Sequence, residues 1–544
     1  MKFNEDARVK IPTILHLTRL GYKYLSLKEH KWDMESNIFP EIFLESVSRI
    51  NPSFEKDDIQ RELQDLKLTL DNDDLGKVFF SKLVNRAGIK LIDFENINNN
   101  TFNVVTELTC QNGDDEFRPD ITILVNGMPL VFIEVKKPNN KDGVLAERDR
   151  INKRFQNSKF KRFINITQFM IFSNNMEYDD EAIQPIMGAF YATPSYHKPS
   201  FNYFREEEIF NLTHLLSPLA ESEEIRILKD NNFEVIRNSP EFITNKDPNR
   251  PTNRICTSLL SRERLAFMLR YSIAYVETEN GVQKHIMRYP QLFATKAIER
   301  KLDEGIRKGI IWHTQGSGKT ALTYYNVKFL TDYYQQNNVI PKFYFIVDRL
   351  DLLQQAQSEF ASRGLVVHTI NSRDEFTKDI KATKVIHNNS GKPEITVINI
   401  QKFADDPTIV STKDYSVDIQ RVYFLDEVHR SYNPKGSFLA NLDVSDRNAI
   451  KIGLTGTPLL GTDYNSRSLF GDYIHKYYYN ASIADGYTLR LIREDIQTNY
   501  KIALQEALAQ AEVKQGDVDK KIIYAHPTFV EPMLDYIVQD FENS

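Results

Sequence analysis

The chain has 544 residues, 41% hydrophobic and 26% charged, which is typical of a globular protein of about three domains. Its formal net charge of −6 argues against a surface that is basic throughout, although basic residues could still line a channel for nucleic acid. Two cysteines exclude a disulfide framework and no run of 18 apolar residues could span a membrane, so we expect a cytoplasmic protein without a membrane partner.

The N-terminal half contains both helix and strand patterns. Apolar residues at helical spacing predict a helix over residues 9–20. Two apolar runs, 120–125 (DITILV) and 130–136 (LVFIEVK), predict strands. The Asn-Gly pair at 126–127 predicts a tight hairpin between them, because both residues accept a positive φ. Turn-forming residues at 238–254 predict a linker between domains.

The predicted hairpin carries an unusual set of charges. Glu134 and Lys136 are two residues apart on one strand and therefore point to the same face, and Asp120 opens the paired strand within reach of that face. Asp120 and Glu134 could hold Mg²⁺ against a phosphodiester, while Lys136 orients water and stabilises the developing charge. The alternative is an exposed Glu–Lys pair on a strand, which has no catalytic role.

The C-terminal half has a different hydrophobic pattern. From residue 255 to about 480, short apolar runs alternate with helix-compatible segments, which predicts a parallel sheet wrapped by helices. The runs are 309–312, 343–347, 366–370, 395–399, 421–425 and 449–454.

The first of these runs leads into residues 313–320 (HTQGSGKT), a glycine-bearing loop before a helix start. Loop amides and the helix N-terminus can face the phosphates of ATP, Lys319 can reach the terminal phosphates, and the Thr320 hydroxyl can ligate Mg²⁺. His313 stands where the first glycine of this motif is usual. The alternative is a glycine turn before a surface helix. The expected phosphate-binding residues are Gly316, Ser317, Gly318, Lys319 and Thr320.

Two further signals follow strands downstream of this loop. Asp426 and Glu427 end the run at 421–425, where Asp426 can hold Mg²⁺ and Glu427 can polarise the attacking water. Residues 455–457 (TGT) follow the run at 449–454. Nucleotides bind at the carboxyl edge of such sheets, so we expect these signals to converge there.

These motifs resemble motifs I, II and III of superfamily 2 helicases and translocases. Val428 replaces the usual alanine of motif II, and residues 347–349 and 398–403 resemble motifs Ia and Ib. The resemblance implies DNA-backbone contacts from Arg349 and Gln401. It also implies that Thr455 and Thr457 couple ATP hydrolysis to movement on DNA.

Upstream, residues 288–291 (RYPQ) resemble the adenine-reading segment of this superfamily, with Arg288 and Gln291 in the implied role. A Gln amide carries both a donor and an acceptor for an adenine edge. A helix start with proline in its first turn is an equally good interpretation.

The hairpin itself resembles the PD-(D/E)xK nuclease signature. With its surroundings, residues 118–121 (RPDI), 126–130 (NGMPL) and 134–138 (EVKKP), it resembles the motor (R) subunit of type I restriction enzymes. The resemblance covers residues from about 5 to about 490. It implies an α/β fold with a PD-(D/E)xK nuclease domain and linker at 1–254, then a RecA-like ATPase lobe at 255–475. Residues 476–544 would begin a second, truncated lobe.

This resemblance implies an ATP- and Mg²⁺-dependent DNA translocase and endonuclease that cleaves double-stranded DNA away from the recognition site. Its implied partners are the methyltransferase (M) and specificity (S) subunits. Two alternatives stay open: a repair or remodelling motor whose N-terminal domain binds DNA without cutting it, and a non-catalytic, ATP-gated assembly module.

Two departures from the family pattern stand out. No clean Gln-x-x-x-Tyr element occurs between residues 140 and 170, and no arginine-finger element follows Pro458. We therefore expect a fragment that hydrolyses ATP poorly and does not translocate.

Overall fold

The computed structural model describes residues 5–136, 143–177, 189–195, 200–382, 387–388, 392–403, 419–427, 438–458, 466–488 and positions 530, 534 and 538. The chain divides into two compact units, Met1–Thr488 and Leu489–Ser544. All elements below belong to the first unit. The second lobe expected for residues 476–544 lies mostly outside the described residues.

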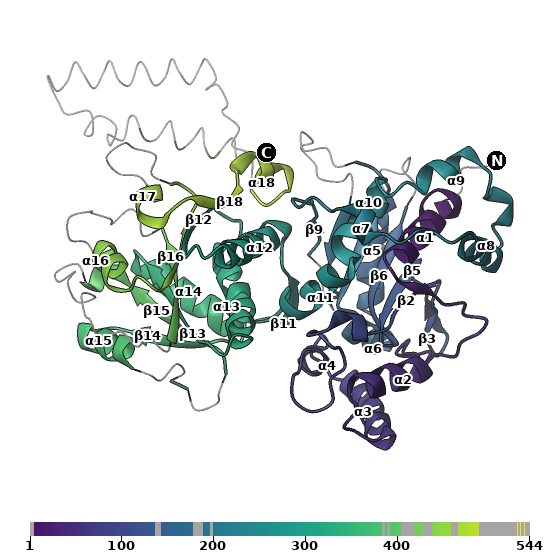
Figure 1. The fold of residues 1–544 in the computed structure, drawn as a ribbon, viewed down its shortest axis with the longest axis horizontal. Helices are drawn as coiled ribbons and strands as arrows, with labels where there is room; N and C mark the ends of the chain where they lie inside the picture. The colour runs from purple at the N-terminus through teal and green to yellow at the C-terminus, as the bar shows by residue number, and fades with distance from the viewer. Residues whose placement is uncertain are drawn as a thin grey trace, which may run out of the picture. The chain divides into compact units, whose positions relative to one another are not determined.

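The N-terminal half is built on a seven-stranded mixed sheet in the order β1-β2-β5-β6-β7-β8-β9 (Figure 1). Strands β5 and β6 are antiparallel, whereas β6 and β7 are parallel. Every residue of β5 and β6 is buried. The strands are β1 (Lys23–Tyr24), β2 (Phe102–Thr106), β5 (Ile121–Val125), β6 (Met128–Val135), β7 (Phe169–Ser173), β8 (Ala189–Ala192) and β9 (Asn202–Tyr203).

The predicted hairpin is confirmed at the turn between β5 and β6. Asn126 and Gly127 have φ angles of 49° and 78°, the left-handed values that this turn needs. Glycine is also required at 127 for space, because a Cβ there would lie 2.7 Å from the carbonyl oxygen of Phe39. The turn therefore fixes which strand ends meet at the opposite end of the hairpin.

Helices pack around this sheet, and the helix predicted at residues 9–20 is confirmed as a π-helical turn (Asp6–Lys10) that continues into α1 (Ile11–Arg19). A small hairpin of β3 (Cys110–Asn112) and β4 (Asp115–Phe117) stands apart from the main sheet. The remaining helices are α2 (Pro40–Ile50), α3 (Lys56–Thr69), α4 (Lys77–Leu83), α5 (Gly143–Phe155), α6 (Lys161–Ile166), α7 (Leu212–Leu215) and α8 (Glu221–Asp230).

Residues 238–254 are folded rather than forming the predicted linker. They contain α9 (Pro240–Asn245) and the start of α10 (Pro251–Leu260). Their turn formers start helices: Ser239 caps α9 by accepting from the Phe242 amide, and each helix has a proline in its first turn. Helix α10 packs against α1, so this segment belongs to the core of the N-terminal half.

The C-terminal half holds a second seven-stranded sheet, in the order β14-β15-β13-β16-β17-β12-β18 (Figure 1). Every neighbouring pair in it is parallel, as the alternating sequence pattern predicts. The strands are β12 (Lys308–His313), β13 (Ile340–Val347), β14 (Val366–Ile370), β15 (Glu394–Asn399), β16 (Ile419–Asp426), β17 (Ile450–Thr455) and β18 (Tyr473–Tyr477).

The six predicted runs are all strands of this sheet, and β18 adds the seventh. The predicted domain boundary at residue 475 falls inside β18, which pairs with β12. Helix α13 packs against β13, and α14 packs against β14 and β15. The connecting helices are α12 (Tyr289–Asp303), α13 (Lys319–Gln335), α14 (Leu350–Ser362), α15 (Arg373–Lys381), α16 (Phe438–Ser445), α17 (Ser466–Phe470) and α18 (Tyr479–Ala484).

Helix α11 (Arg262–Tyr271) and a hairpin of β10 (Ile273–Thr278) and β11 (Gly281–Ile286) connect the two halves in sequence. The α/β fold class predicted from the sequence, with a parallel sheet in the second half, is confirmed. Within the described ranges, no helix combines the length and apolar character needed to cross a membrane. Both cysteines, Cys110 and Cys256, are buried free thiols.

Candidate functional site

The first candidate site lies at the open end of the β5–β6 hairpin. Asp120 precedes β5 and Glu134 lies near the end of β6, and the antiparallel register Ile121↔Ile133 brings these strand ends together. The Nζ of Lys136 lies 3.7 Å from Oδ2 of Asp120 and 3.7 Å from Oε2 of Glu134. The fold thus brings together the three residues that the sequence singled out.

A third carboxylate, which the sequence analysis missed, completes this cluster. Glu147 of α5 is 2% exposed, and its Oε2 lies 3.3 Å from the Nζ of Lys136. Arg150 pairs with the same carboxylate, and Arg154 Nη1 lies 3.8 Å from Glu147 Oε1. The spacing of these three charges places them on one face of α5, since residues three and four apart share a helix face, but it does not show that this face meets Lys136.

Burial and charge repulsion both act on Glu134. Burial, together with the nearby Asp120 and Glu147 carboxylates, raises the pKa of Glu134 well above its ordinary value, and Lys136 opposes this only in part. Burial works to lower the pKa of Lys136, but Asp120, Glu134 and Glu147 outweigh it and hold that pKa above its ordinary value. Lys136 therefore keeps its charge among these acids, while the ionised form of Glu134 is disfavoured.

The donor set of this cluster fits a divalent cation. Glu134 Oε1 is buried and receives no hydrogen bond. Asp120 Oδ2 accepts from the Val135 amide at 3.0 Å, which fixes its carboxylate beside Glu134. Mg²⁺ prefers carboxylate oxygens, and a cation at Asp120 and Glu134 would favour the ionised form of Glu134 and supply the missing partner of its Oε1.

The second candidate site begins at the carboxyl end of β12. Gly316 and Gly318 both have φ of 83°, and Gly318 precedes the first residue of α13, Lys319. The loop amides and the start of this 17-residue helix therefore lie together, as an anion site requires. The Oγ of Ser317 is buried and receives no hydrogen bond, so it is available to a ligand. Thr320 follows in the first turn of the helix.

The unusual His313 of this loop points into the interior. Its Nε2 lies 2.7 Å from Nδ1 of His475 on β18, and His475 Nε2 lies 2.7 Å from Oε2 of Glu207. Burial, with the neighbouring His475 and Lys319, lowers the pKa of His313 well below its ordinary value, so the ring is neutral. The histidine thus joins the loop to the edge strand of the sheet.

Arg288 and Gln291, expected at the adenine edge, bind the backbone of the phosphate loop. Gln291 Nε2 donates to the Gly318 carbonyl at 2.9 Å, and Arg288 Nη1 donates to the Gly316 carbonyl at 3.0 Å. Glycine is favoured at 318 by its φ of 83°, and a Cβ there would lie 2.5 Å from Gln291 Nε2 and would displace this amide. These residues also form the start of α12, with Pro290 in its first turn, so the helix-start interpretation is confirmed and the adenine-reading role stays a prediction.

Asp426 and Glu427 end β16 beside this loop. Lys319 Nζ lies 3.6 Å from Glu427 Oε1, and the positive charge of Lys319 also interacts with the Asp426 carboxylate. Burial raises the pKa of Asp426 to about 6; Lys319 opposes this shift and Glu427 adds to it. Asp426 Oδ1 is buried without a hydrogen bond, which fits a place in the Mg²⁺ shell.

Residues of motif III hold the carboxylate of Glu427 by hydrogen bonds. Glu427 has a left-handed φ of 52°, which is uncommon for a residue with a Cβ. Its two carboxylate oxygens accept from the Thr455 hydroxyl at 2.6 Å and from the Gly456 amide at 2.8 Å. Thr455 also accepts from the Thr457 amide at 3.0 Å. The orientation of Glu427 is therefore set by the residues after β17.

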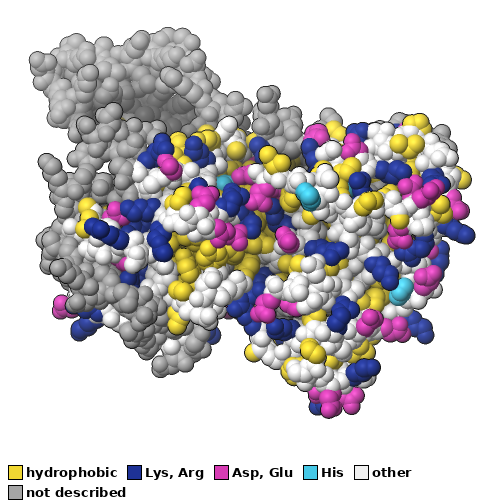
Figure 2. All heavy atoms as spheres, viewed as in Figure 1, with side chains coloured by type: hydrophobic (Ala, Val, Ile, Leu, Met, Phe, Trp, Pro, Cys, Tyr) yellow, Lys and Arg dark blue, Asp and Glu magenta, His cyan; other side chains and the backbone are white. Residues whose placement is uncertain are grey.

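The two residues expected to touch the DNA backbone are exposed at the carboxyl ends of strands. Arg349 follows β13 and Gln401 follows β15, so both lie at the same edge of the sheet as the phosphate loop. On the face shown in Figure 2, Lys and Arg side chains are interspersed with Asp and Glu. The part of motif II from Val428 onward lies outside the described residues.

Comparison with protein families gives two matches. Residues 2–179 match the family described as type I restriction enzyme R protein N terminus (HSDR_N), and residues 290–521 match the SWI2/SNF2 ATPase family. The first match contains Asp120, Glu134, Lys136 and Glu147, and the second contains the phosphate loop and the acid pair.

Curated relatives agree with these matches. The chain is 26% identical over 471 residues to the putative type I restriction enzyme MjaVIIIP endonuclease subunit of Methanocaldococcus jannaschii, covering 80% of this chain and 40% of the relative. It is 24% identical over 564 residues to the type I restriction enzyme SauCOLORF180P endonuclease subunit of Staphylococcus aureus, covering 97% of this chain and 52% of the relative. The chain thus spans about half the length of the curated relatives it matches.

One similar solved structure is that of a nuclease-deletion mutant of the Type ISP restriction-modification enzyme LlaGI in complex with a DNA substrate mimic. The match covers 42% of this chain and 23% of the LlaGI chain. That match has 14% identity and a TM-score of 0.27.

The family matches and curated relatives confirm the resemblance to type I restriction endonuclease subunits that the sequence motifs predicted.

Proposed function

We propose that the protein is an ATP-dependent DNA translocase and endonuclease of a type I restriction system. It cleaves double-stranded DNA away from a site that a specificity subunit recognises, and it works with a methyltransferase subunit. The observation that carries this proposal is the presence of two separate acid-and-lysine clusters in one chain. One surrounds Lys136 in the N-terminal sheet, and the other surrounds Lys319 in the parallel sheet.

Domain roles follow from these positions. We assign the nuclease to residues 1–254, the first ATPase lobe to 255–475 and the start of a second lobe to 476–544. The compact unit that ends at Thr488 contains both clusters, and β18 extends the parallel sheet across the proposed boundary at 475.

In the nuclease cluster, Asp120 and Glu134 would hold Mg²⁺, which when bound polarises the scissile phosphate. Lys136 lies between the carboxylates with its ammonium held in place by three of them. It is thereby positioned to orient water and to stabilise charge that develops on the phosphate. Glu147 acts through Lys136, which makes it a positioning residue.

In the ATPase cluster, the loop amides, Lys319 and Thr320 would bind the phosphates of MgATP, with Asp426 in the metal shell. Glu427 is the group placed to orient the attacking water. Thr455 and the Gly456 amide hold its carboxylate, so a shift of the segment after β17 would move Glu427. This contact offers a route by which DNA bound near motif III could control hydrolysis.

The proposal is tested with the protein assembled with its methyltransferase and specificity subunits, on a circular plasmid that the complex cuts with ATP. Lys319→Ala should reduce both ATP hydrolysis and cleavage by roughly 100-fold or more, because it removes charge stabilisation at the phosphates. Lys229→Ala, at an exposed position of α8, serves as the control and should leave both rates unchanged. Unchanged ATP-dependent cleavage by Lys319→Ala would contradict the proposal.

A further inference from the structure

A cluster of two histidines and two carboxylates lies on the parallel sheet, away from the nucleotide edge. His368 lies in β14, Asp379 in the last turn of α15, His387 beyond that helix, and Glu394 is the first residue of β15. Lys319 and Asp426 lie at the carboxyl ends of parallel strands, whereas Glu394 lies at an amino end. The cluster is therefore separate from the proposed ATPase site.

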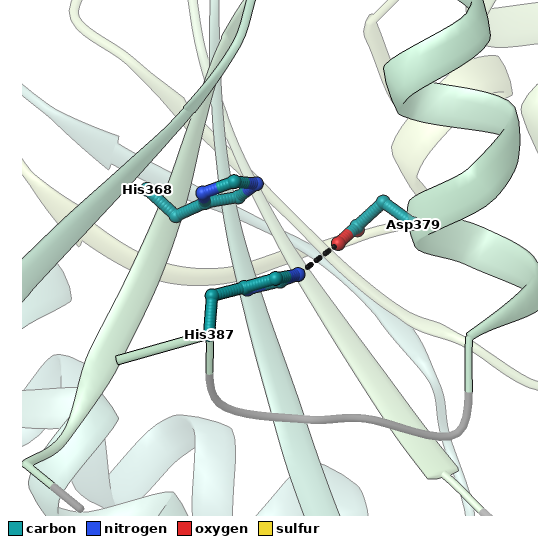
Figure 3. Close-up of side chains that lie close together, drawn as sticks. All are labelled: His368, Asp379 and His387. Atoms are coloured by element: carbon teal, nitrogen blue, oxygen red, sulfur yellow. Dashed lines mark ion pairs between the residues drawn. The ribbon is translucent and has the colours of Figure 1, made fainter. Parts of the chain in front are cut away.

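The two histidine rings share one side of the Asp379 carboxylate. Their centroids are 3.9 Å apart and their planes differ by 12°, and Figure 3 shows one ring nitrogen of each histidine on the side facing Asp379. The nearest possible ligand atoms of His368, Asp379 and His387 all lie within 4.8 Å of one another. These atoms are already close to the spacing of a common coordination sphere.

His387 lies between two carboxylates and cannot satisfy both as a neutral ring. Its Nε2 lies 2.9 Å from Asp379 Oδ1, and its Nδ1 lies 2.6 Å from Glu394 Oε1. A neutral imidazole carries one N–H, so it can donate to only one of these oxygens. At the other contact a lone pair would face a carboxylate oxygen, unless a second proton or a metal ion lies there.

The cluster also holds two buried carboxylates beside one ammonium. Asp379 and Glu394 are 5% and 8% exposed, so water does little to screen them. Lys342 Nζ lies 2.7 Å from Asp379 Oδ1, and the Tyr344 hydroxyl donates to Asp379 Oδ2 at 2.7 Å. The charge of Lys342 acts on Asp379 and on Glu394, so one ammonium serves two carboxylates. Lys342 and Tyr344, from β13, also fix the orientation of Asp379.

We infer that His368, Asp379 and His387 bind one divalent transition-metal ion, with Zn²⁺ the best match to two imidazoles and a carboxylate. Glu394 accepts the Nδ1–H of His387, which leaves Nε2 as the ligand, the usual arrangement of a carboxylate–histidine–zinc triad. Water would complete four-coordination. His387 is 29% exposed, so the ion can enter from solvent.

Binding requires a small rearrangement of the rings. Tetrahedral zinc with bonds of about 2.0–2.1 Å keeps its ligand atoms roughly 3.4 Å apart, so ligand atoms that lie within 4.8 Å of one another must close by at most about 1.4 Å. The parallel rings must also tilt, because each nitrogen lone pair lies in its own ring plane. The ion then links edge strand β14 to α15 and to the start of β15, which makes the site structural.

The test uses the full chain, stripped of metal by a chelator and then titrated with Zn²⁺ in competition with a chromophoric chelator. The expected result is one tight site per chain that is lost in both His368→Asn and His387→Gln. Glu394→Gln should weaken binding by roughly 10- to 100-fold, because the acceptor of Nδ1–H loses its charge. His214→Asn, at an exposed histidine, and Asp120→Asn, in the nuclease cluster, should keep the site.

A second measurement covers the case in which a variant folds poorly. Added Zn²⁺ should raise the thermal midpoint of the metal-free wild type, since it binds the folded state, and should leave both histidine variants unmoved. The inference is overturned if the wild type binds no zinc tightly, or if binding and the thermal shift survive in the histidine variants. In that case His387 only bridges Asp379 and Glu394 through its two ring nitrogens.

Discussion

Glu147 Oε2 lies 3.3 Å from the Nζ of Lys136, closer than either Asp120 or Glu134, whose oxygens are both 3.7 Å away. A carboxylate from α5, the helix that follows the hairpin in the chain, therefore holds the lysine at the end of that hairpin. This contact fixes the ammonium beside the two proposed metal-binding acids, and it defines a role for α5 that no motif indicates.

Removing the charge of Glu147 should impair cleavage alone. Glu147→Gln keeps the shape of the side chain but weakens its hold on Lys136, so DNA cleavage by the assembled complex should fall roughly 10- to 100-fold. ATP hydrolysis, measured in the same reactions, should not change. The matched control is Asp149→Asn, an exposed position on the same helix, which should cut at the wild-type rate. Equal cleavage by Glu147→Gln and wild type would remove Glu147 from the site.

Nucleotide binding should be linked to a proton on Asp426. The pKa of this buried acid is raised to about 6, so below pH 6 a bound cation must displace a proton. The affinity for Mg-nucleotide should therefore fall by up to about tenfold per pH unit below 6 and level off above it. Fluorescence titrations of wild type and Asp426→Asn isolate this effect, because protonation of the nucleotide is common to both. Identical pH slopes in the two proteins would refute the linkage.

The Thr455 hydroxyl should matter for turnover more than for binding. Thr455→Val removes its 2.6 Å hydrogen bond to Glu427 Oε2 and leaves the Gly456 amide on Oε1, so the Glu427 carboxylate is held less firmly. We expect kcat for ATP hydrolysis to drop by roughly tenfold or more, a loss of about 1.4 kcal/mol, with KM for ATP little changed. Thr455→Ser restores the hydroxyl and should recover most of the rate. Failure of the serine variant to recover it would point to packing of the methyl group instead.

Lys284 should make stability depend on pH. It is buried in β11, where its Nζ donates to the Thr167 carbonyl at 2.8 Å, and burial lowers its pKa to about 7. An unfolded lysine keeps its proton up to about pH 10.4, so the unfolded state binds more protons between pH 7 and 10 and stability rises with pH in that window. At pH 7 the buried charge costs on the order of 4 kcal/mol, partly offset by the hydrogen bond.

Lys284→Met removes this charge and should therefore raise the thermal midpoint at pH 7. Its advantage over wild type should shrink by pH 9.5, where the folded lysine is neutral. The comparison of the two proteins at each pH cancels the titration of all other groups. A constant difference across this pH range would show that Lys284 keeps its proton in the folded state.

Much of the fold could be predicted because it depends on local patterns. The apolar runs became strands of the parallel sheet, and the Asn-Gly pair at 126–127 formed the expected hairpin. That hairpin alone places Asp120 opposite Glu134, so the core of the first candidate site follows from turn chemistry and strand alternation. The phosphate loop follows β12 for the same kind of reason.

Contacts between side chains of different helices and strands could not be predicted. Glu147 sits in a helix with charges at many positions, and the sequence does not show which of them faces Lys136. His313 meets His475 only because β18 pairs with β12 at the sheet edge. The His368–Asp379–His387 cluster depends on a strand, a helix and the segment after it, at spacings that match no metal motif. The linker prediction for residues 238–254 is wrong because proline and other turn-forming residues occur both in linkers and in the first turns of helices.

The measurement that most directly tests the account of two separate centres is the pair of rates, ATP hydrolysis and DNA cleavage, for Glu134→Gln in the assembled complex. Glu134 belongs to the nuclease cluster, and no contact of it with the ATPase cluster is found among the described residues. The account predicts wild-type ATP hydrolysis with cleavage reduced by roughly 100-fold or more. Cleavage by Glu134→Gln at the wild-type rate would contradict it.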